Sequence, residues 1–162
     1  MTTKPAASTA DSNANLQRPV EVVHVNWLGR DEVEIRANWQ GGKLVGLKPV
    51  QSVLCESATK ALAIWMQSCL QAGQVLEGPL GQDHASMLVR EVSLRLRNEF
   101  RPPYTEEEIC HCRVISTAQV DRAVIAGCQS AREVAGETTA STSCGTCRPD
   151  LEAWIRFRYE TR

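Results

Sequence analysis

Apolar and polar residues alternate with a period of two over three consecutive segments in the first third of the chain. In segment 33–39 every second residue is apolar, which is typical of a strand with one buried face. The same alternation predicts a strand over 20–28, and a third is predicted over 44–54. Short links between consecutive strands favour an antiparallel meander. Because Pro49 cannot donate a ladder hydrogen bond, the third strand is expected at a sheet edge or in a bulge.

The spacing of apolar residues then changes to that of helices. A helix is predicted over 58–72, with Gly73 at its C-cap. Asp83 can act as the N-cap of a second helix, whose apolar residues recur every four positions as far as the Arg-Pro-Pro segment 101–103. Residues 20–103 are therefore predicted to form a small α+β domain, a three-stranded antiparallel sheet with two helices.

The remainder of the chain carries helix signals alone. Two capping boxes, in which a serine precedes a Gln or Glu by three residues, begin at Ser116 and Ser130. The second predicts a short helix that ends before Gly136, and Pro149 fits the first turn of a last helix. We expect a small all-α domain over 104–162, which makes the whole chain α+β.

The net charge and the lack of long apolar runs argue against nucleic-acid and membrane partners. The formal net charge of −1 and a pI near 6.3 predict no general attraction to nucleic acid or to anionic membranes. No apolar run approaches the length of a membrane-spanning helix. Residues 1–19 lack the apolar core of a secretory signal and are predicted to be a disordered tail. A cytoplasmic protein without nucleic-acid or membrane partners is expected.

The chain has seven cysteines, an odd number that does not suit a disulfide framework. Three are single: Cys55, Cys69 on an apolar helix face, and Cys128. We expect Cys69 to be a core residue and Cys128 a packing residue or a surface thiol. A reducing compartment and metal ligation are the better interpretation of the remaining four.

Those four form two tight pairs. Cys110-His111-Cys112 is followed, after thirty-one residues, by Cys144-Gly145-Thr146-Cys147. Two thiolates for each of two irons are what a [2Fe–2S] cluster requires. The spacing alone equally allows a structural Cys₄ zinc site, or a pair of redox-active thiols. The ring of His111 is expected to point to solvent, and Gly145 to let the main chain approach a cluster.

The spacing of the two pairs resembles that of the bacterioferritin-associated ferredoxin family, whose module also occupies the central part of NifU. The likeness includes Ile109 before the first cysteine, the helix start at Ser116 and Thr117, and the CGxC form of the second pair. It covers about residues 106–157. The resemblance implies a [2Fe–2S] cluster ligated by Cys110, Cys112, Cys144 and Cys147.

The order of elements before this module resembles the U-type scaffold of NifU. Cys55 lies near one of the family's ligand positions, and Asp31 stands where the family has an aspartate. His84 begins a segment similar to the scaffold's His-Cys-Ser motif, with Ala85 where a ligand cysteine belongs. Since two of three scaffold thiolates are missing, residues 1–103 alone are predicted to hold no cluster and to act as a docking surface. A homodimer that brings two copies of Cys55 together stays open.

These observations predict a NifU-like iron–sulfur protein that is not an enzyme. Its permanent cluster would pass single electrons to a protein redox or cluster-assembly partner, in cluster assembly or iron metabolism. Two alternatives remain at this point, a zinc-stabilised adaptor and a redox-sensing regulatory protein. Visible absorption distinguishes a cluster from bound zinc.

Overall fold

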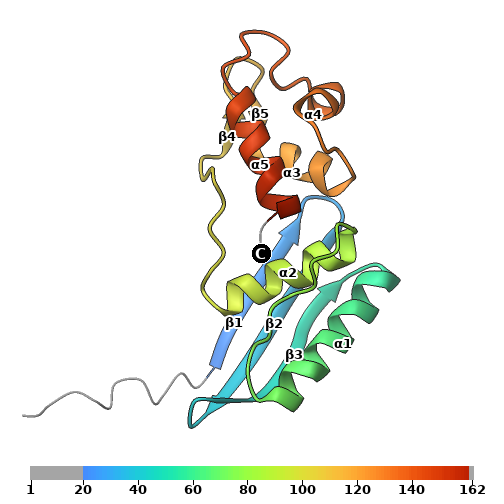
Figure 1. Cartoon of the computed structure of the whole chain (residues 1–162), viewed down its shortest axis with the longest axis vertical. Coiled ribbons are helices and arrows are strands. Elements are labelled where there is room, and N and C mark those ends of the chain that lie inside the picture. Colours follow the sequence, from blue (N-terminus) through green and yellow to red (C-terminus); the bar gives the residue numbers. More distant parts are fainter. Residues whose placement is uncertain (1–19, 161–162) are drawn as a thin grey trace, which may run out of the picture.

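The computed structural model describes residues 20–160, without the side chain of Glu160, and it consists of two parts joined end to end (Figure 1). The predicted tail over 1–19 lies outside the described residues. In the first part, β1 (Val20–Trp27), β2 (Asp31–Gln40) and β3 (Lys43–Val53) form an antiparallel sheet in the order β1-β2-β3. The predicted meander is therefore confirmed.

Alternation along β2 decides which face of the sheet is buried. Val33, Ile35 and Ala37 are completely buried, whereas the residues between them are only partly so. Pro49 lies on β3, an edge strand, and pairs with Ile35 next to a register shift. The edge position and the irregularity expected of this proline are both present.

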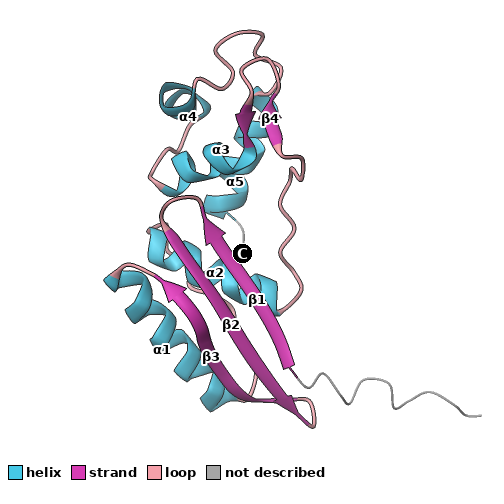
Figure 2. Cartoon of the chain, turned by 180° about the vertical axis from the view of Figure 1, so that it is seen from behind, coloured by secondary structure: helices cyan, strands magenta, loops and turns pink. Residues whose placement is uncertain are grey.

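Two helices cover one face of the sheet and leave the other face open (Figure 2). Helix α1 (Glu56–Ala72) begins after the N-cap Cys55 and ends at Gly73, which has a φ of 68°. Helix α2 (His84–Leu96) begins after the predicted N-cap Asp83, whose side chain accepts a hydrogen bond from the backbone N–H of Ser86. The apolar sides of both helices and the buried sheet face form the first core.

Helix α2 ends at Leu96, so the prediction that it continues to residue 101 is wrong. Asn98 has a φ of 57°, and the backbone N–H groups of Glu99 and Phe100 both donate to the carbonyl oxygen of Leu94. This turn brings the ring of Phe100 to 5.4 Å from that of Phe157, centroid to centroid. Phe100 is therefore apolar because it packs against the second part of the chain, and not because it continues the buried face of α2.

The second part contains β4 (Glu108–Cys110), β5 (Ile115–Ser116), α3 (Thr117–Ile125), α4 (Ala131–Thr138) and α5 (Arg148–Glu160). Both capping boxes are present, at Ser116 and Ser130, and Pro149 lies in the first turn of α5 as predicted. Helix α4 continues through Gly136 rather than ending before it. The predicted helical second part is confirmed by these three helices, and it also contains a short antiparallel hairpin of β4 and β5.

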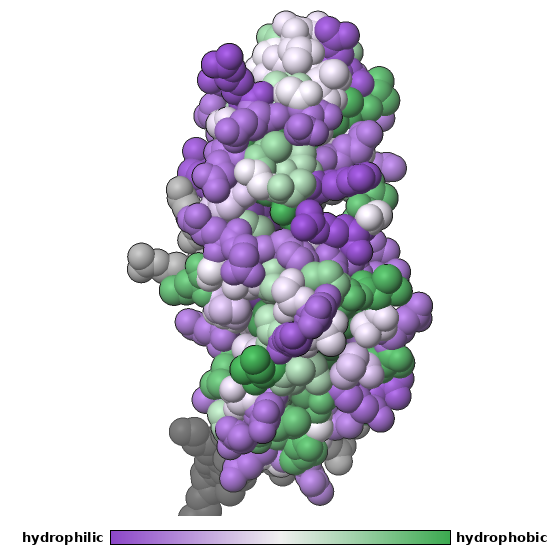
Figure 3. Space-filling model, turned by 90° about the vertical axis from the view of Figure 1, so that its right-hand side faces the viewer, coloured by the Kyte–Doolittle hydropathy of each residue, from purple (hydrophilic) through white to green (hydrophobic). Residues whose placement is uncertain are grey.

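No helix within residues 20–160 has both the length and the apolar character needed to cross a membrane. On the side of the molecule seen in Figure 3, polar residues are interspersed with apolar ones over both parts.

A buried arginine joins the two parts. The side chain of Arg158, near the end of α5, forms ion pairs of 2.6 Å with Glu91 of α2 and 2.6 Å with Asp121 of α3. Each carboxylate also accepts a hydrogen bond from an indole N–H. Trp27 donates to Glu91 at 2.9 Å, and Trp154 donates to Asp121 at 2.7 Å. Although burial opposes its charge, the two carboxylates raise the pKa of Arg158, so the guanidinium stays charged.

Apolar side chains also pack across the junction between the two parts. Ile125 of α3 belongs to the first core, and Tyr159 of α5 packs against both the first core and the second. The two parts therefore share apolar contacts as well as charges, and the boundary at residue 103 stays a prediction.

We predict that Arg158→Met lowers the free energy of unfolding by about 3–5 kcal/mol, because Asp121 loses its ion pair and the buried Glu91 keeps only its ion pair with Arg95. Denaturant-induced unfolding followed by circular dichroism measures the change. Arg156→Met is the matched control, since Arg156 lies on the same helix and is exposed. Equal stability of the two variants would show that the buried ion pairs contribute nothing beyond packing.

Candidate metal centre

The β4–β5 hairpin and the loop before α5 bring the four paired cysteines together. Cys110 ends β4, Cys112 lies in the hairpin turn, and Cys144 and Cys147 lie just before Arg148, where α5 begins. The Cys112 sulfur is 3.8 Å from that of Cys110 and 3.4 Å from that of Cys144. The fourth cysteine, Cys147, is close enough to Cys110 that Cys110 helps to raise its pKa. All four predicted ligands therefore meet at one place.

The four sulfurs divide into an inner and an outer pair. Cys110 and Cys147 are buried and belong to the second core, together with Ile109 and Leu151. Cys112 and Cys144 are exposed. A metal group held here would be anchored in the core on one side and accessible at the surface on the other.

Hydrogen bonds from the surrounding loop shift the acidity of these thiols. The hydroxyl and backbone N–H of Thr146 lower the pKa of Cys144 to about 7. Burial opposes ionisation of Cys110, but donors led by the backbone N–H of Ser141 lower its pKa. Burial, reinforced by Cys110, raises the pKa of Cys147 to about 11. The loop therefore directs N–H and O–H donors at the sulfurs, as an anionic metal–thiolate centre requires.

Left-handed backbone conformations are concentrated in the same loops. Val114 in the hairpin turn and Thr139 and Ser141 before the second pair have φ values of 53°, 64° and 63°. Such conformations are costly for residues other than glycine, and they persist where the surrounding structure imposes them. Gly145 has a φ of 75°, and a Cβ there would meet no other atom within 4 Å. Its role within the chain is thus to permit the turn rather than to avoid a clash.

The spread of the four sulfurs favours a binuclear group over a single ion. Around one zinc ion, with Zn–S bonds of about 2.3 Å, all four sulfurs would lie about 3.8 Å apart. Within residues 20–160, however, the one group of three or more candidate ligands with every separation below 4.8 Å is Asp31, Cys55 and His84. The four cysteines therefore span more than the size of a mononuclear site, which suits two metals with two thiolates each.

The other predictions about single residues are confirmed where the structure describes them. His111 is 69% exposed and faces Glu106 and Glu108 rather than the sulfurs. Cys69 is completely buried in the first core, and burial raises its pKa. Cys128 is half-buried at the edge of the second core, between the two alternatives expected for it.

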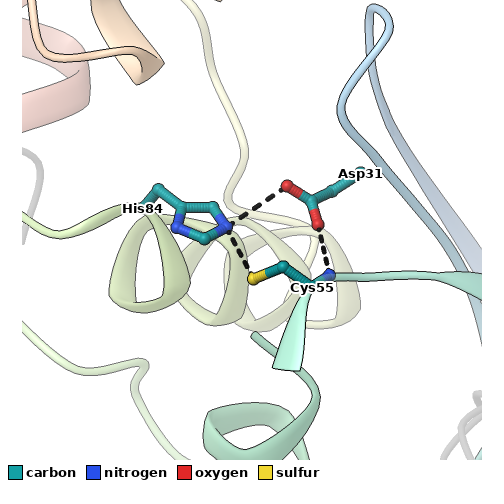
Figure 4. Close-up of side chains that lie close together, drawn as sticks. All are labelled: Asp31, Cys55 and His84. Atoms are coloured by element: carbon teal, nitrogen blue, oxygen red, sulfur yellow. Dashed lines mark hydrogen bonds and ion pairs between the residues drawn. The ribbon is translucent and has the colours of Figure 1, made fainter. Parts of the chain in front are cut away.

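The sequence did not predict the loop donors Ser141 and Thr146 or the ion pairs of Arg158. No local pattern marks them, because each acts on a residue brought near by folding. The sequence did point to Asp31, Cys55 and His84 one at a time, and the structure brings these three together in the first part (Figure 4).

Comparison with known proteins agrees with this geometry. Residues 108–156 match the family model of the BFD-like [2Fe-2S] binding domain. No curated protein and no solved structure matches the chain. These comparisons therefore give no support to a U-type scaffold in the first part. The segment 108–156 is therefore similar to the BFD-like [2Fe-2S] binding domain, and the cofactor that this similarity supports is a [2Fe–2S] cluster.

Proposed function

We propose that this protein carries single electrons on a [2Fe–2S] cluster ligated by Cys110, Cys112, Cys144 and Cys147. The observation that carries the proposal is the convergence of the four sulfurs inside the segment that matches a [2Fe–2S] binding domain. When bound, the cluster supplies a one-electron couple between two irons. The side chains around it have no acid–base or nucleophilic role in this proposal, so the protein is not an enzyme.

The residues of the chain would hold the cluster and adjust its charge. Cys110 and Cys147 lie in the core and exclude water from the inner side. Ser141 and Thr146 donate hydrogen bonds to Cys110 and Cys144, and such donors stabilise additional negative charge on the sulfurs. Cys112 and Cys144 are exposed, which places the outer edge where a protein partner can approach. This arrangement supports electron exchange at the surface.

We further propose that the electrons serve cluster assembly or iron metabolism, and that the first part docks an assembly partner. Support comes from the meander, followed by α1 and α2, in the order of a NifU-like protein. Ala85 stands where that resemblance places a ligand cysteine. None of the seven cysteines forms a disulfide, which supports a reducing compartment such as the cytoplasm.

We predict about two irons and two sulfides per chain, and loss of the visible spectrum when any of the four cysteines is replaced by Ala. Anaerobic purification with iron, sulfide and zinc counted per chain provides the measurement. Cys128→Ala is the control, because Cys128 lies outside the four-sulfur group. A colourless protein with one zinc would favour the adaptor alternative, and a full spectrum in Cys144→Ala would contradict the ligand assignment.

Replacement of Gly145 and of Gly136 by alanine should change the stability of the protein in opposite directions. Gly145→Ala forces a left-handed conformation on alanine, at a cost of roughly 1–2 kcal/mol, and should speed cluster loss to a chelator. Gly136→Ala lies inside α4 with open space for a Cβ, and should stabilise the protein by about 0.5–1 kcal/mol. Thermal unfolding of the cluster-loaded variants compares them. A change of the same sign in both would contradict this role for Gly145.

Removal of iron should affect the second part more than the first. Two buried residues of the second core, Cys110 and Cys147, are proposed ligands, and that core is small. We expect amide NMR signals from 104–160 to broaden after chelation, while those from 20–103 stay dispersed. Within the first part, signals from residues that pack against Ile125 should shift, since this residue belongs to the first core. Collapse of both regions would show a single cooperative unit.

A further inference from the structure

Three residues of the first part converge at one end of the sheet, away from the four-sulfur group. Asp31 begins β2, Cys55 is the N-cap of α1, and His84 is the first residue of α2. In Figure 4 the three side chains point toward a common centre. The Nε2 atom of His84 is 3.3 Å from the Cys55 sulfur and 3.3 Å from Oδ2 of Asp31. All three ligand atoms lie within 4.8 Å of one another.

Asp31 is the most unusual member of this group. The residue is 2% exposed, and in the described part of the chain its buried Oδ2 accepts no hydrogen bond. Its other oxygen, Oδ1, accepts a hydrogen bond of 3.1 Å from the backbone N–H of Cys55, which fixes the carboxylate. A buried carboxylate oxygen that accepts no hydrogen bond is costly, and the nitrogens of His84 and Arg30 approach this one only to 3.3 Å and 3.7 Å. This oxygen is directed at the space between His84 and Cys55.

A nucleophile triad does not explain the arrangement. In such a triad the carboxylate holds one ring nitrogen of the histidine and the nucleophile contacts the other. Here both Cys55 and Asp31 contact the same nitrogen, Nε2 of His84. Three ligand atoms around a single point are instead the geometry of a metal ion. Tetrahedral Zn²⁺ with S, N and O ligands separates these atoms by about 3.3–3.6 Å.

We propose that Asp31, Cys55 and His84 bind one borderline divalent cation of the Zn²⁺ class, independently of the [2Fe–2S] cluster. Thiolate, imidazole and carboxylate together suit zinc better than the oxygen-seeking Mg²⁺ or Ca²⁺. Binding releases the proton of the Cys55 thiol to solvent, so that one thiolate and one carboxylate neutralise the cation. Three protein ligands leave a fourth tetrahedral position for water or an external ligand.

Neighbouring groups also act on this charge balance. The hydroxyl of Ser57 lies 3.0 Å from the Cys55 sulfur and can donate to the thiolate. The guanidinium of Arg30 lies 3.7 Å from Oδ2 of Asp31, on an exposed side chain that can turn away. The ring of Trp27 lies 6.3 Å from that of His84 and limits its movement. Because Cys55 is exposed, the open position is accessible from solvent.

Zn²⁺ titration of the cluster-loaded full chain tests the proposal. We expect one additional Zn²⁺ per chain by calorimetry, with the visible spectrum of the cluster unchanged. Zinc-edge X-ray absorption should show one sulfur at about 2.3 Å and nitrogen or oxygen ligands at about 2.0–2.2 Å. Four sulfur neighbours, or bleaching of the cluster, would overturn the proposal by placing zinc at the other cysteines.

Variants locate the ion. Cys55→Ala, His84→Ala and Asp31→Asn should each weaken Zn²⁺ binding by at least about tenfold. His24→Ala and Cys128→Ala are matched controls, because His24 forms an exposed pair with Glu32 and Cys128 lies in the second part. Cys55→Ser keeps a side chain of similar shape, and circular dichroism checks that each variant is folded. Unchanged affinity in folded Cys55→Ser and His84→Ala would refute the site.

Discussion

The buried charge of Arg158 is the interaction on which the joint between the two parts depends. Its guanidinium lies between Glu91 of the first part and Asp121 of the second, and each carboxylate also accepts an indole N–H. Burial of these charges is tolerated only while each is paired, so the two parts pack in an orientation that keeps Glu91 and Asp121 on the same guanidinium. Helix α5 starts one residue after Cys147 and ends near Arg158. Helix α5 therefore connects the loop that holds Cys144 and Cys147 to the first part.

Trp27 lies between this junction and the group of Asp31, Cys55 and His84. Its indole N–H donates to Glu91, while its ring lies beside that of His84. The proposed cation site and the junction of the two parts thus share a buried residue. The two sites differ in chemistry, since four thiolates suit iron and sulfide, whereas one thiolate with an imidazole and a carboxylate suits a single borderline ion.

Local signals in the sequence were reliable where the physics is local. The caps at Asp83, Ser116 and Ser130 were predicted, because a side chain that satisfies a free backbone N–H lies within three residues of it. The end of α2 was missed, because Phe100 follows the helical spacing but packs against Phe157, far along the chain. The hairpin around Cys110 was also missed, since strands of three and two residues carry almost no periodic pattern.

The α+β order of elements and the four cysteines of the candidate cluster site can be predicted from the sequence, because alternation, caps and paired spacing are local properties. The convergence of Asp31, Cys55 and His84, and the place of Arg158 between two carboxylates, arise from tertiary packing. These residues come from elements far apart in the chain. Their approach depends on how the helices pack on the sheet and on one another, and packing of this kind leaves no spacing signal in the sequence.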